Sequence, residues 1–139
     1  DHAPPPRQEK DAGIGDAPSG VPGVETALPL LLAQARQGTL GFDRVRDLTA
    51  RNPAAIFGLP RKGGIEEGNH ADLVLVDTDD VEHIRATDLH TNVGWTPFEG
   101  HEAVFPEWTM CRGQVVYRRG RDSFEPHQGE NVRRENSDR

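Results

Sequence analysis

The spacing of apolar residues changes once along this chain, and that change limits the folds open to it. Before residue 58 the apolar residues recur at helical spacing, as Leu28, Leu31 and Leu32 do. After Gly63-Gly64 they stand in short runs that are typical of strands. The chain is therefore expected to combine helices with a small sheet, an architecture of mixed α/β type.

The helical part predicts three segments. The first follows the change of pattern at Val24 and has Leu28, Leu31, Leu32 and Ala35 at helical spacing. Pro29 is expected near its first turn, where a missing N–H is tolerated, and Gly38 at its end. The second runs from about Phe42 to Ala50 and is stopped by Asn52-Pro53. The third, Pro53 to Phe57, is ended by Gly58 and Pro60.

The later part predicts strands. The run Leu73–Val76, bounded by two aspartates, is typical of a buried strand, and Val81–Ile84 is a second candidate. Residues 108–112 and 114–117, joined at Gly113, indicate a hairpin. We expect Leu73–Val76 to be largely buried and to pack near this hairpin.

The two ends of the chain lack apolar periodicity. The first 24 residues contain Pro4, Pro5, Pro6, Pro18 and Pro22, and so predict a long loop. A loop of that length within a domain is usually functional or disordered. Residues 120–139 are polar and charged, and we expect them to form a disordered tail.

Composition excludes several classes of function. The net charge of −7 disfavours a nucleic-acid partner, which needs clustered basic residues. Cys111 is the only cysteine, so an internal disulfide and a cysteine-based zinc site are both excluded. The sequence shows no apolar run of about 20 residues and no signal peptide. We therefore expect no membrane association and a soluble, cytoplasmic protein.

The pair Asp1-His2, followed by prolines, is the strongest chemical signal in the residues themselves. An aspartate can bind a divalent metal ion and can accept a proton from a water bound to that ion. Taken alone, the pair is a weak signal, and an ordinary chain end is the simpler interpretation. The histidines from residue 70 onward are scattered without metal-ligand spacing and indicate solvent or packing roles. Trp95 is more typical of packing than of substrate stacking.

Six sequence blocks occur in the order in which the dihydroorotase family of cyclic amidohydrolases has them. They are Asp1-His2-Ala3-Pro4, Ala17–Leu30, Asn52–Leu59, Lys62–Asp77, Gly94–Gly100 and Arg112–Tyr117. The blocks Gly-Val-Pro-Gly-Val-Glu-Thr-Ala and Gly-Trp-Thr-Pro-Phe-Glu-Gly resemble dihydroorotase most narrowly, and together the blocks cover roughly residues 1 to 120. The chain is thus identified as a dihydroorotase-like sequence.

This resemblance implies a fold and a division of the chain. It implies the C-terminal end of a (β/α)8 amidohydrolase barrel together with part of a small antiparallel β annex. Residues 1–60 would form the last active-site loop and the terminal helices of the barrel. Residues 61–119 would form the annex strands and hairpin, and 120–139 the disordered tail. Because the chain does not begin with methionine and already starts in an active-site loop, we expect a fragment.

The resemblance also implies a chemistry. Asp1 would be both the catalytic residue and a ligand of one of two zinc ions, and the backbone at Ser19 and Gly20 would contact the substrate, dihydroorotate. Asp1 would take up a proton and pass it to the leaving amide nitrogen. The other metal ligands of the family belong to earlier barrel strands. We therefore expect these 139 residues alone to be inactive and to bind zinc weakly.

Pro5 departs from the family pattern. Family members usually have a histidine here, which holds the carboxylate of dihydroorotate, and proline offers no such donor. Dihydroorotase remains the leading interpretation, and an allantoinase or another cyclic amidase is the alternative that Pro5 favours. A non-catalytic relative that serves as a partner of a carbamoyltransferase is the third interpretation. A homo-oligomer is also compatible with the resemblance.

Overall fold

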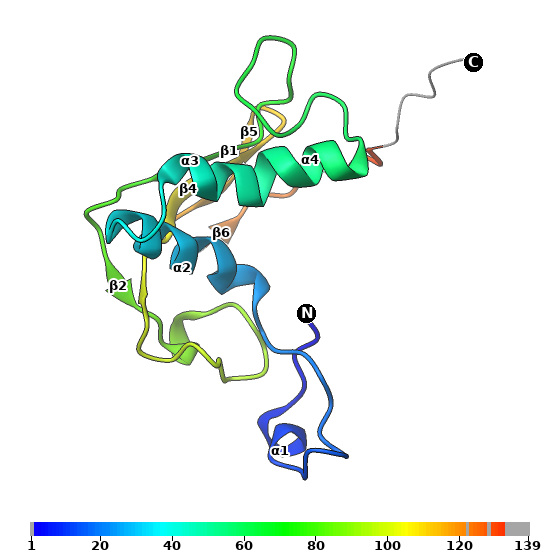
Figure 1. Cartoon of the computed structure of the whole chain (residues 1–139), viewed down its shortest axis with the longest axis vertical. Helices are drawn as coiled ribbons and strands as arrows, with labels where there is room; N and C mark the ends of the chain where they lie inside the picture. Colours follow the sequence, from blue (N-terminus) through cyan, green and yellow to red (C-terminus); the bar gives the residue numbers. More distant parts are fainter. Residues whose placement is uncertain (1, 122, 128, 133–139) are drawn as a thin grey trace. The chain divides into compact units, whose positions relative to one another are not determined.

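The computed structural model describes residues 2–121, 123–127 and 129–132 (Figure 1). Internal contacts divide the chain into two compact units. The first unit contains the described residues up to Thr39 together with Thr78–Phe105, and the second contains Leu40–Asp77 together with the described residues from Pro106 onward. The units interleave in sequence because the strands after Pro106 pair with a strand that precedes Thr78.

The first unit consists of a long loop, one main helix and a small strand pair. Its elements are α1 (Arg7–Lys10), α2 (Val24–Arg36), β2 (Glu82–His83), η2 (Ala86–Asp88) and β3 (Glu102–Ala103). β2 lies within the candidate strand predicted at 81–84, and it pairs with β3 in antiparallel orientation. α2 packs against β3, and the Val104 N–H donates to the Pro29 carbonyl at 3.1 Å.

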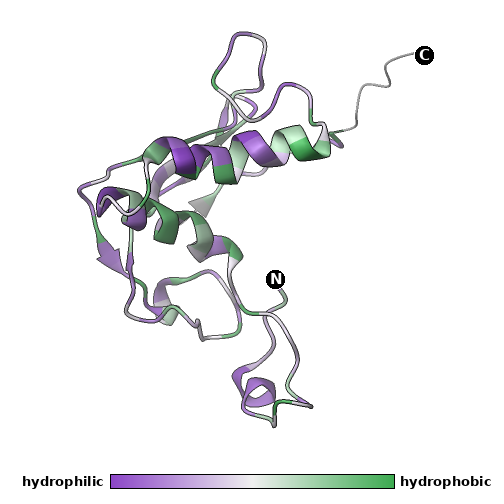
Figure 2. Cartoon of the chain, in the orientation of Figure 1, coloured by the Kyte–Doolittle hydropathy of each residue, from purple (hydrophilic) through white to green (hydrophobic). Residues whose placement is uncertain are grey.

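The apolar side of α2 forms much of the core of the first unit. Figure 2 shows hydrophobic residues over much of this helix, and Leu32, Ala33 and Ala35 are buried together with Ile84 and Val104. The predicted helix is confirmed and spans Val24–Arg36. Pro29 therefore lies inside the helix rather than in its first turn.

A continuous helical run opens the second unit (Figure 1). It comprises α3 (Phe42–Arg46), a π-helical turn η1 (Asp47–Arg51) and α4 (Asn52–Phe57). The predicted stop at Asn52-Pro53 is wrong. The wider π turn directly before Pro53 accommodates the missing N–H of proline, so the helix continues through it. Gly58, with φ 59°, ends the run as predicted.

A four-stranded antiparallel sheet completes the second unit. Its order is β1 (Leu73–Val76), β4 (Pro106–Cys111), β5 (Gln114–Arg118) and β6 (Ser123–Phe124). The predicted hairpin is confirmed. Its two turn residues, Arg112 and Gly113, both have positive φ angles, 46° and 83°, as the common two-residue hairpin turn requires.

Two expectations about this sheet need correction. Leu73–Val76 is a strand beside the hairpin, but Val74 and Leu75 are 47% and 48% exposed, so they are not buried. β1 is an edge strand of the sheet, which leaves it with a single neighbour. The expected disordered tail begins with strand β6, because Phe124 pairs with Tyr117 and the two ring centroids lie 5.3 Å apart.

Candidate active-site loop

The loop that precedes α2 is held by the residues that follow Asp1. Asp1 itself lies outside the described residues, so its role remains a prediction. The Nδ1 atom of His2 accepts hydrogen bonds from the backbone N–H groups of Gly23 and Val24, both at 3.2 Å. His2 therefore caps the N-terminus of α2, where the first N–H groups of the helix need an acceptor.

Ala3 makes the second contact with this loop. Gly20 has φ 88°, and a Cβ atom built on it would lie 2.8 Å from both the Cβ and the carbonyl oxygen of Ala3. Only glycine allows so close an approach. The structure thus brings Ser19 and Gly20 beside the segment that follows Asp1. Ser19 is exposed and Gly20 half-buried, and their predicted contact with a substrate remains a prediction.

Pro5 is buried in the first unit. Its carbonyl oxygen accepts a hydrogen bond from the indole Nε1–H of Trp95 at 2.8 Å, and Trp95 is only 8% exposed. The Arg7 guanidinium lies over the same indole ring, 5.8 Å from its centroid. The expected packing role of Trp95 is confirmed, and the Gly94–Gly100 block therefore supports the proline-rich segment.

Two further contacts fix the loop and the start of α2. Lys10 Nζ donates a hydrogen bond to the Pro18 carbonyl at 2.6 Å and so joins the end of α1 to the loop that follows it. Glu25 contacts His90 through both carboxylate oxygens: Oε2 accepts the His90 N–H at 2.9 Å, and Oε1 lies 2.6 Å from Nδ1. Sequence reasoning missed these contacts and the His2 cap. The one signal for the cap in the sequence was Gly23. It has no side chain with which to cap α2, so the acceptor has to come from another residue.

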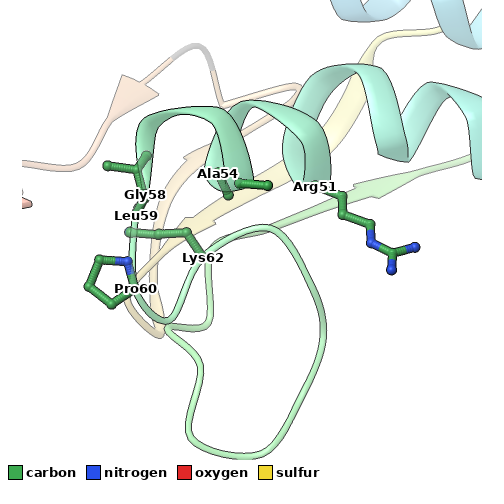
Figure 3. Close-up of a pocket in the computed structure, with 7 residues that line it drawn as sticks. Arg51, Ala54, Gly58, Leu59, Pro60 and Lys62 are labelled. Carbon is green, nitrogen blue, oxygen red and sulfur yellow. The ribbon is translucent and has the colours of Figure 1, made fainter. Parts of the chain in front are cut away.

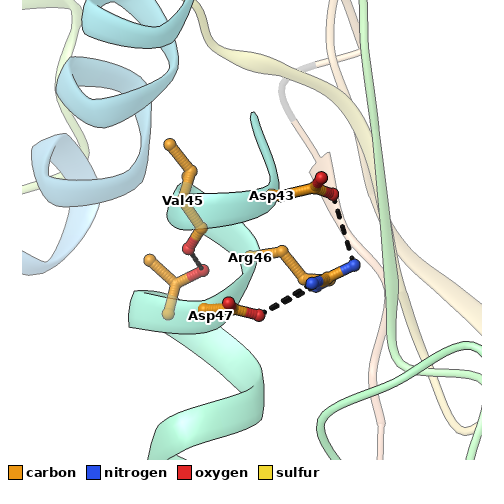
Figure 4. A network of polar contacts seen from close by, with 5 residues as sticks. Asp43, Val45, Arg46 and Asp47 are labelled. Carbon is orange, nitrogen blue, oxygen red and sulfur yellow. Dashed lines mark hydrogen bonds and ion pairs between the residues drawn. The ribbon is translucent and has the colours of Figure 1, made fainter. Parts of the chain in front are cut away.

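The second unit has charged clusters of its own. Arg46 binds Asp47 at 2.8 Å and Asp43 at 3.3 Å (Figure 4). The hydrogen bond from Arg46 lowers the pKa of Asp47, and the same bond raises the pKa of Arg46. Exposed pairs of this kind contribute little to stability. They involve none of the predicted site residues.

Asp72 joins the loop after α4 to the hairpin. Its carboxylate pairs with Lys62 and accepts the Arg112 N–H at 2.8 Å. Partial burial acts to raise the pKa of Asp72, but the hydrogen bonds from Lys62 and Arg112 together with nearby positive charge outweigh this and hold the pKa below its usual range. Lys62 also lines a shallow hollow at the end of α4 with Arg51 and Pro60 (Figure 3).

Comparison with known proteins assigns the family. The model of the amidohydrolase family matches residues 20–117. This chain belongs to the amidohydrolase family. A dihydroorotase of Halobacterium salinarum is 59% identical over 133 residues, which is 96% of this chain and 31% of the relative. A dihydroorotase of Methanosarcina acetivorans is 49% identical over 132 residues, which is 94% of this chain and 28% of the relative.

Solved structures agree with this assignment. A D-hydantoinase (dihydropyrimidinase) from a Thermus species matches this amidohydrolase with a TM-score of 0.88 and 33% identity, over 97% of this chain and 31% of that one. A dihydropyrimidinase from Brevibacillus agri matches with a TM-score of 0.79 and 30% identity, over 88% of this chain and 28% of that one. The expected mixed α/β piece of an amidohydrolase with antiparallel strands is confirmed. The chain spans about a third of the length of these relatives.

The described part of this amidohydrolase does not by itself fit a metal centre. Within residues 2–121, 123–127 and 129–132, no three His, Cys, Asp or Glu side chains come together as a metal site would require. In the same residues no helix is long and apolar enough to cross a membrane. What the first unit offers is a scaffold that holds the residues after Asp1 against the Ser19–Val24 segment.

Proposed function

We propose that this amidohydrolase chain is part of a dihydroorotase, which reversibly hydrolyses the cyclic amide of dihydroorotate in pyrimidine biosynthesis. The dihydroorotases of two archaea, 59% and 49% identical to it, support the proposal. The structural observation that carries it is the double contact of His2 with Gly23–Val24 and of Ala3 with Gly20. It joins the segment after Asp1 to the backbone that we expect to contact the substrate.

In this proposal Asp1 is the proton carrier. It accepts a proton from the attacking water and delivers it to the leaving amide nitrogen, while the backbone of Ser19 and Gly20 holds the ring. Two zinc ions are the proposed cofactors, and Asp1 is a ligand of one of them. The family resemblance assigns the other zinc ligands to earlier barrel strands, and within the described residues no three possible ligands come together.

The rest of the architecture is part of the same proposal. The strands of the described residues all pair in antiparallel orientation. The (β/α)8 barrel is therefore proposed from the family alone. Residues 1–60 are assigned to the last barrel loop and helices, 61–119 to the annex, and 120–139 to a tail. We also propose a cytoplasmic enzyme that acts on a small molecule and that assembles with itself or with a carbamoyltransferase.

Another cyclic amidase is the second candidate. The similar solved structures are named as hydantoinases or dihydropyrimidinases, and Pro5 replaces the histidine expected for carboxylate binding. The buried ring of Pro5 has no donor for the carboxylate of dihydroorotate. An unpaired carboxylate in a closed site is costly, so a ring substrate that lacks this group suits Pro5 better.

Substrate turnover separates these candidates. The gene product that carries residues 1–139 should be assayed with dihydroorotate, allantoin and a 5-substituted hydantoin. A kcat/KM highest for dihydroorotate supports the leading proposal, and one highest for either other ring supports the second candidate. No turnover of any of the three favours a non-catalytic partner protein.

A substitution at Pro5 tests the carboxylate argument. Pro5→His should raise kcat/KM for dihydroorotate about tenfold, which is the worth of roughly one charge-assisted hydrogen bond. Pro6→His is the matched control, since Pro6 is exposed and should leave kcat/KM unchanged. An unchanged kcat/KM in Pro5→His would show that position 5 is not part of the carboxylate site.

A further inference from the structure

The side chain of Lys10 contacts a peptide group rather than a carboxylate. Lys10 is the last residue of α1 and is half-buried, whereas the other residues of that short helix are exposed. Its Nζ atom donates to the Pro18 carbonyl at 2.6 Å. Within the described residues Lys10 forms no ion pair. Its positive charge is therefore held beside the Pro18–Ser19 peptide with no carboxylate to neutralise it.

The Pro18–Ser19 peptide carries the effect of this contact to the Ser19 N–H. A trans peptide is planar, and its carbonyl and N–H point in opposite directions. The described residues contain no cis peptide bond, so a donor that fixes the Pro18 carbonyl also fixes the direction of the Ser19 N–H. A cation on the carbonyl polarises the peptide as well, which makes the N–H a stronger donor.

The N–H groups of Ser19 and Gly20 are available to a ligand. In the part of the chain that the structure describes, neither of them donates to a protein acceptor. The preceding N–H groups of Asp16 and Ala17, in contrast, both donate to the Gly13 carbonyl at 2.8 Å. Ser19 is also exposed. Unused N–H groups beside a fixed cation form an electropositive position that suits a carboxylate.

We propose that Lys10 is a positioning residue, which through the Pro18–Ser19 peptide directs and strengthens the Ser19 N–H as a donor to the carboxylate of the ring substrate. This inference rests on the proposed function of the chain. It provides a donor for the carboxylate that Pro5 cannot hold, since proline has no side-chain donor and no N–H. Because Lys10 acts on binding, its loss should raise KM for an anionic ring and leave kcat nearly unchanged.

The test compares two rings, because dihydrouracil differs from dihydroorotate only in lacking the carboxylate. In the gene product that carries this chain, Lys10→Met should raise KM for dihydroorotate about tenfold and change kcat less than about threefold. The inhibition constant of dihydrouracil should change less than about twofold, which a merely structural role of Lys10 would not allow. A parental KM for dihydroorotate, or equal losses of affinity for the two rings, would overturn the proposal.

Two further variants at position 10 separate the charge from the hydrogen bond. Lys10→Arg keeps a cationic donor and should hold KM for dihydroorotate within about threefold of the parent. Lys10→Gln keeps only a neutral donor and should raise this KM at least about threefold. Should Lys10→Met fail to fold, a parental KM in Lys10→Gln would contradict the proposal. Lys62→Met is the matched control, because Lys62, the other lysine of the chain, pairs with Asp72, and both kinetic constants should stay at the parental values.

Selective isotope labelling observes this peptide directly and separates the inference from the proposed function. Pro18–Ser19 is the only Pro-Ser pair in the 139 residues, so proline labelled with ¹³C at the carbonyl and serine labelled with ¹⁵N give one linked amide signal from this chain. The signal should shift in Lys10→Met and stay near its parental position in Lys10→Arg. An unshifted signal in Lys10→Met would show that Lys10 does not hold the peptide, and would overturn the proposal.

Addition of dihydroorotate to the labelled parent completes the test. Saturating dihydroorotate should shift the same signal, because the Ser19 N–H then binds the carboxylate. If the parent hydrolyses dihydroorotate but the signal does not shift, the role of Lys10 fails and the proposed function stands. If the parent does not hydrolyse dihydroorotate, the proposed function fails, and with it the role of Lys10, even where the signal confirms the bond to Pro18.

Discussion

Replacing Gly20 with alanine tests the contact that joins the predicted substrate loop to Ala3. Two costs act together. Gly20 has φ 88°, and a side chain in that left-handed region costs about 1–2 kcal/mol. The added Cβ would also lie 2.8 Å from the Cβ and the carbonyl oxygen of Ala3, and overpacking of this kind costs about 1–3 kcal/mol. Gly20→Ala should therefore lower the free energy of unfolding by about 2–5 kcal/mol.

Gly38 provides the matched control for the backbone cost. It lies in the same unit and has φ 78°, but a Cβ atom there would meet no atom within 4 Å. Gly38→Ala should cost only the strain of about 1–2 kcal/mol. The second unit offers the same comparison, because Gly63 would meet the Ala54 Cβ at 2.8 Å whereas Gly68, with nearly the same φ, would meet nothing.

Urea unfolding of the gene product that carries this chain measures both pairs, with kcat recorded beside it. Within each pair, the variant with a close contact should be the less stable by about 1–3 kcal/mol. Gly20→Ala should also lower kcat, because Ser19 and Gly20 must move away from Ala3. Equal losses of stability in Gly20→Ala and Gly38→Ala, within about 0.5 kcal/mol, would show that Gly20 does not press on Ala3.

Three other changes test separate features by the same unfolding measurement. Trp95→Phe should cost about 1–3 kcal/mol, since it leaves the carbonyl of Pro5 buried without a donor; a loss near zero would contradict the bond. Leu75→Ala should cost about 1 kcal/mol because Leu75 is half-exposed, whereas Leu32→Ala should cost about 2–5 kcal/mol. Equal losses would refute that ranking. The pKa of Asp72 is lower in the folded chain than its ordinary value of about 3.9. The ionised carboxylate therefore stabilises the fold at any pH above that ordinary value, and the stabilisation is lost as the pH falls through the folded-state pKa. The stability gap between the parent and Asp72→Asn should thus be constant above about pH 5 and should shrink in acid; a gap independent of pH would remove this linkage.

Features that depend on neighbouring residues in the sequence were predictable. The apolar spacing of Leu28, Leu31 and Leu32 indicated α2, and Gly113 between two apolar runs indicated the β4–β5 hairpin. The left-handed Gly58 marked the end of α4. Each of these signals arises from backbone preferences within a few residues, so the sequence alone carries them.

Features that depend on distant residues were not predictable. The cap that His2 provides for α2 joins residues far apart in sequence, and the helical run that begins at Phe42 continues past Pro53, which a π turn precedes. The exposure of Leu75 depends on what packs over β1, which an apolar run does not reveal. In each case tertiary context overrides the local pattern.

The candidate site was predictable only in part. The assignments of Ser19 and Gly20 come from family resemblance, since neither residue type signals substrate binding by itself. The resemblance did not indicate that Gly20 touches Ala3, that Trp95 binds the Pro5 carbonyl or that Glu25 contacts His90. These contacts join segments up to 90 residues apart, and only the folded chain brings them together.

Turnover of dihydroorotate by an Asp1→Ala variant tests the central claim most directly. In the gene product that carries this chain, the substitution should lower kcat by several orders of magnitude, more than the roughly 10²–10⁴-fold of acid–base catalysis alone, because Asp1 is proposed both to carry the proton and to bind zinc. Asp16→Ala, an exposed aspartate of the same loop, should leave kcat unchanged. Near-parental turnover in Asp1→Ala would contradict the account.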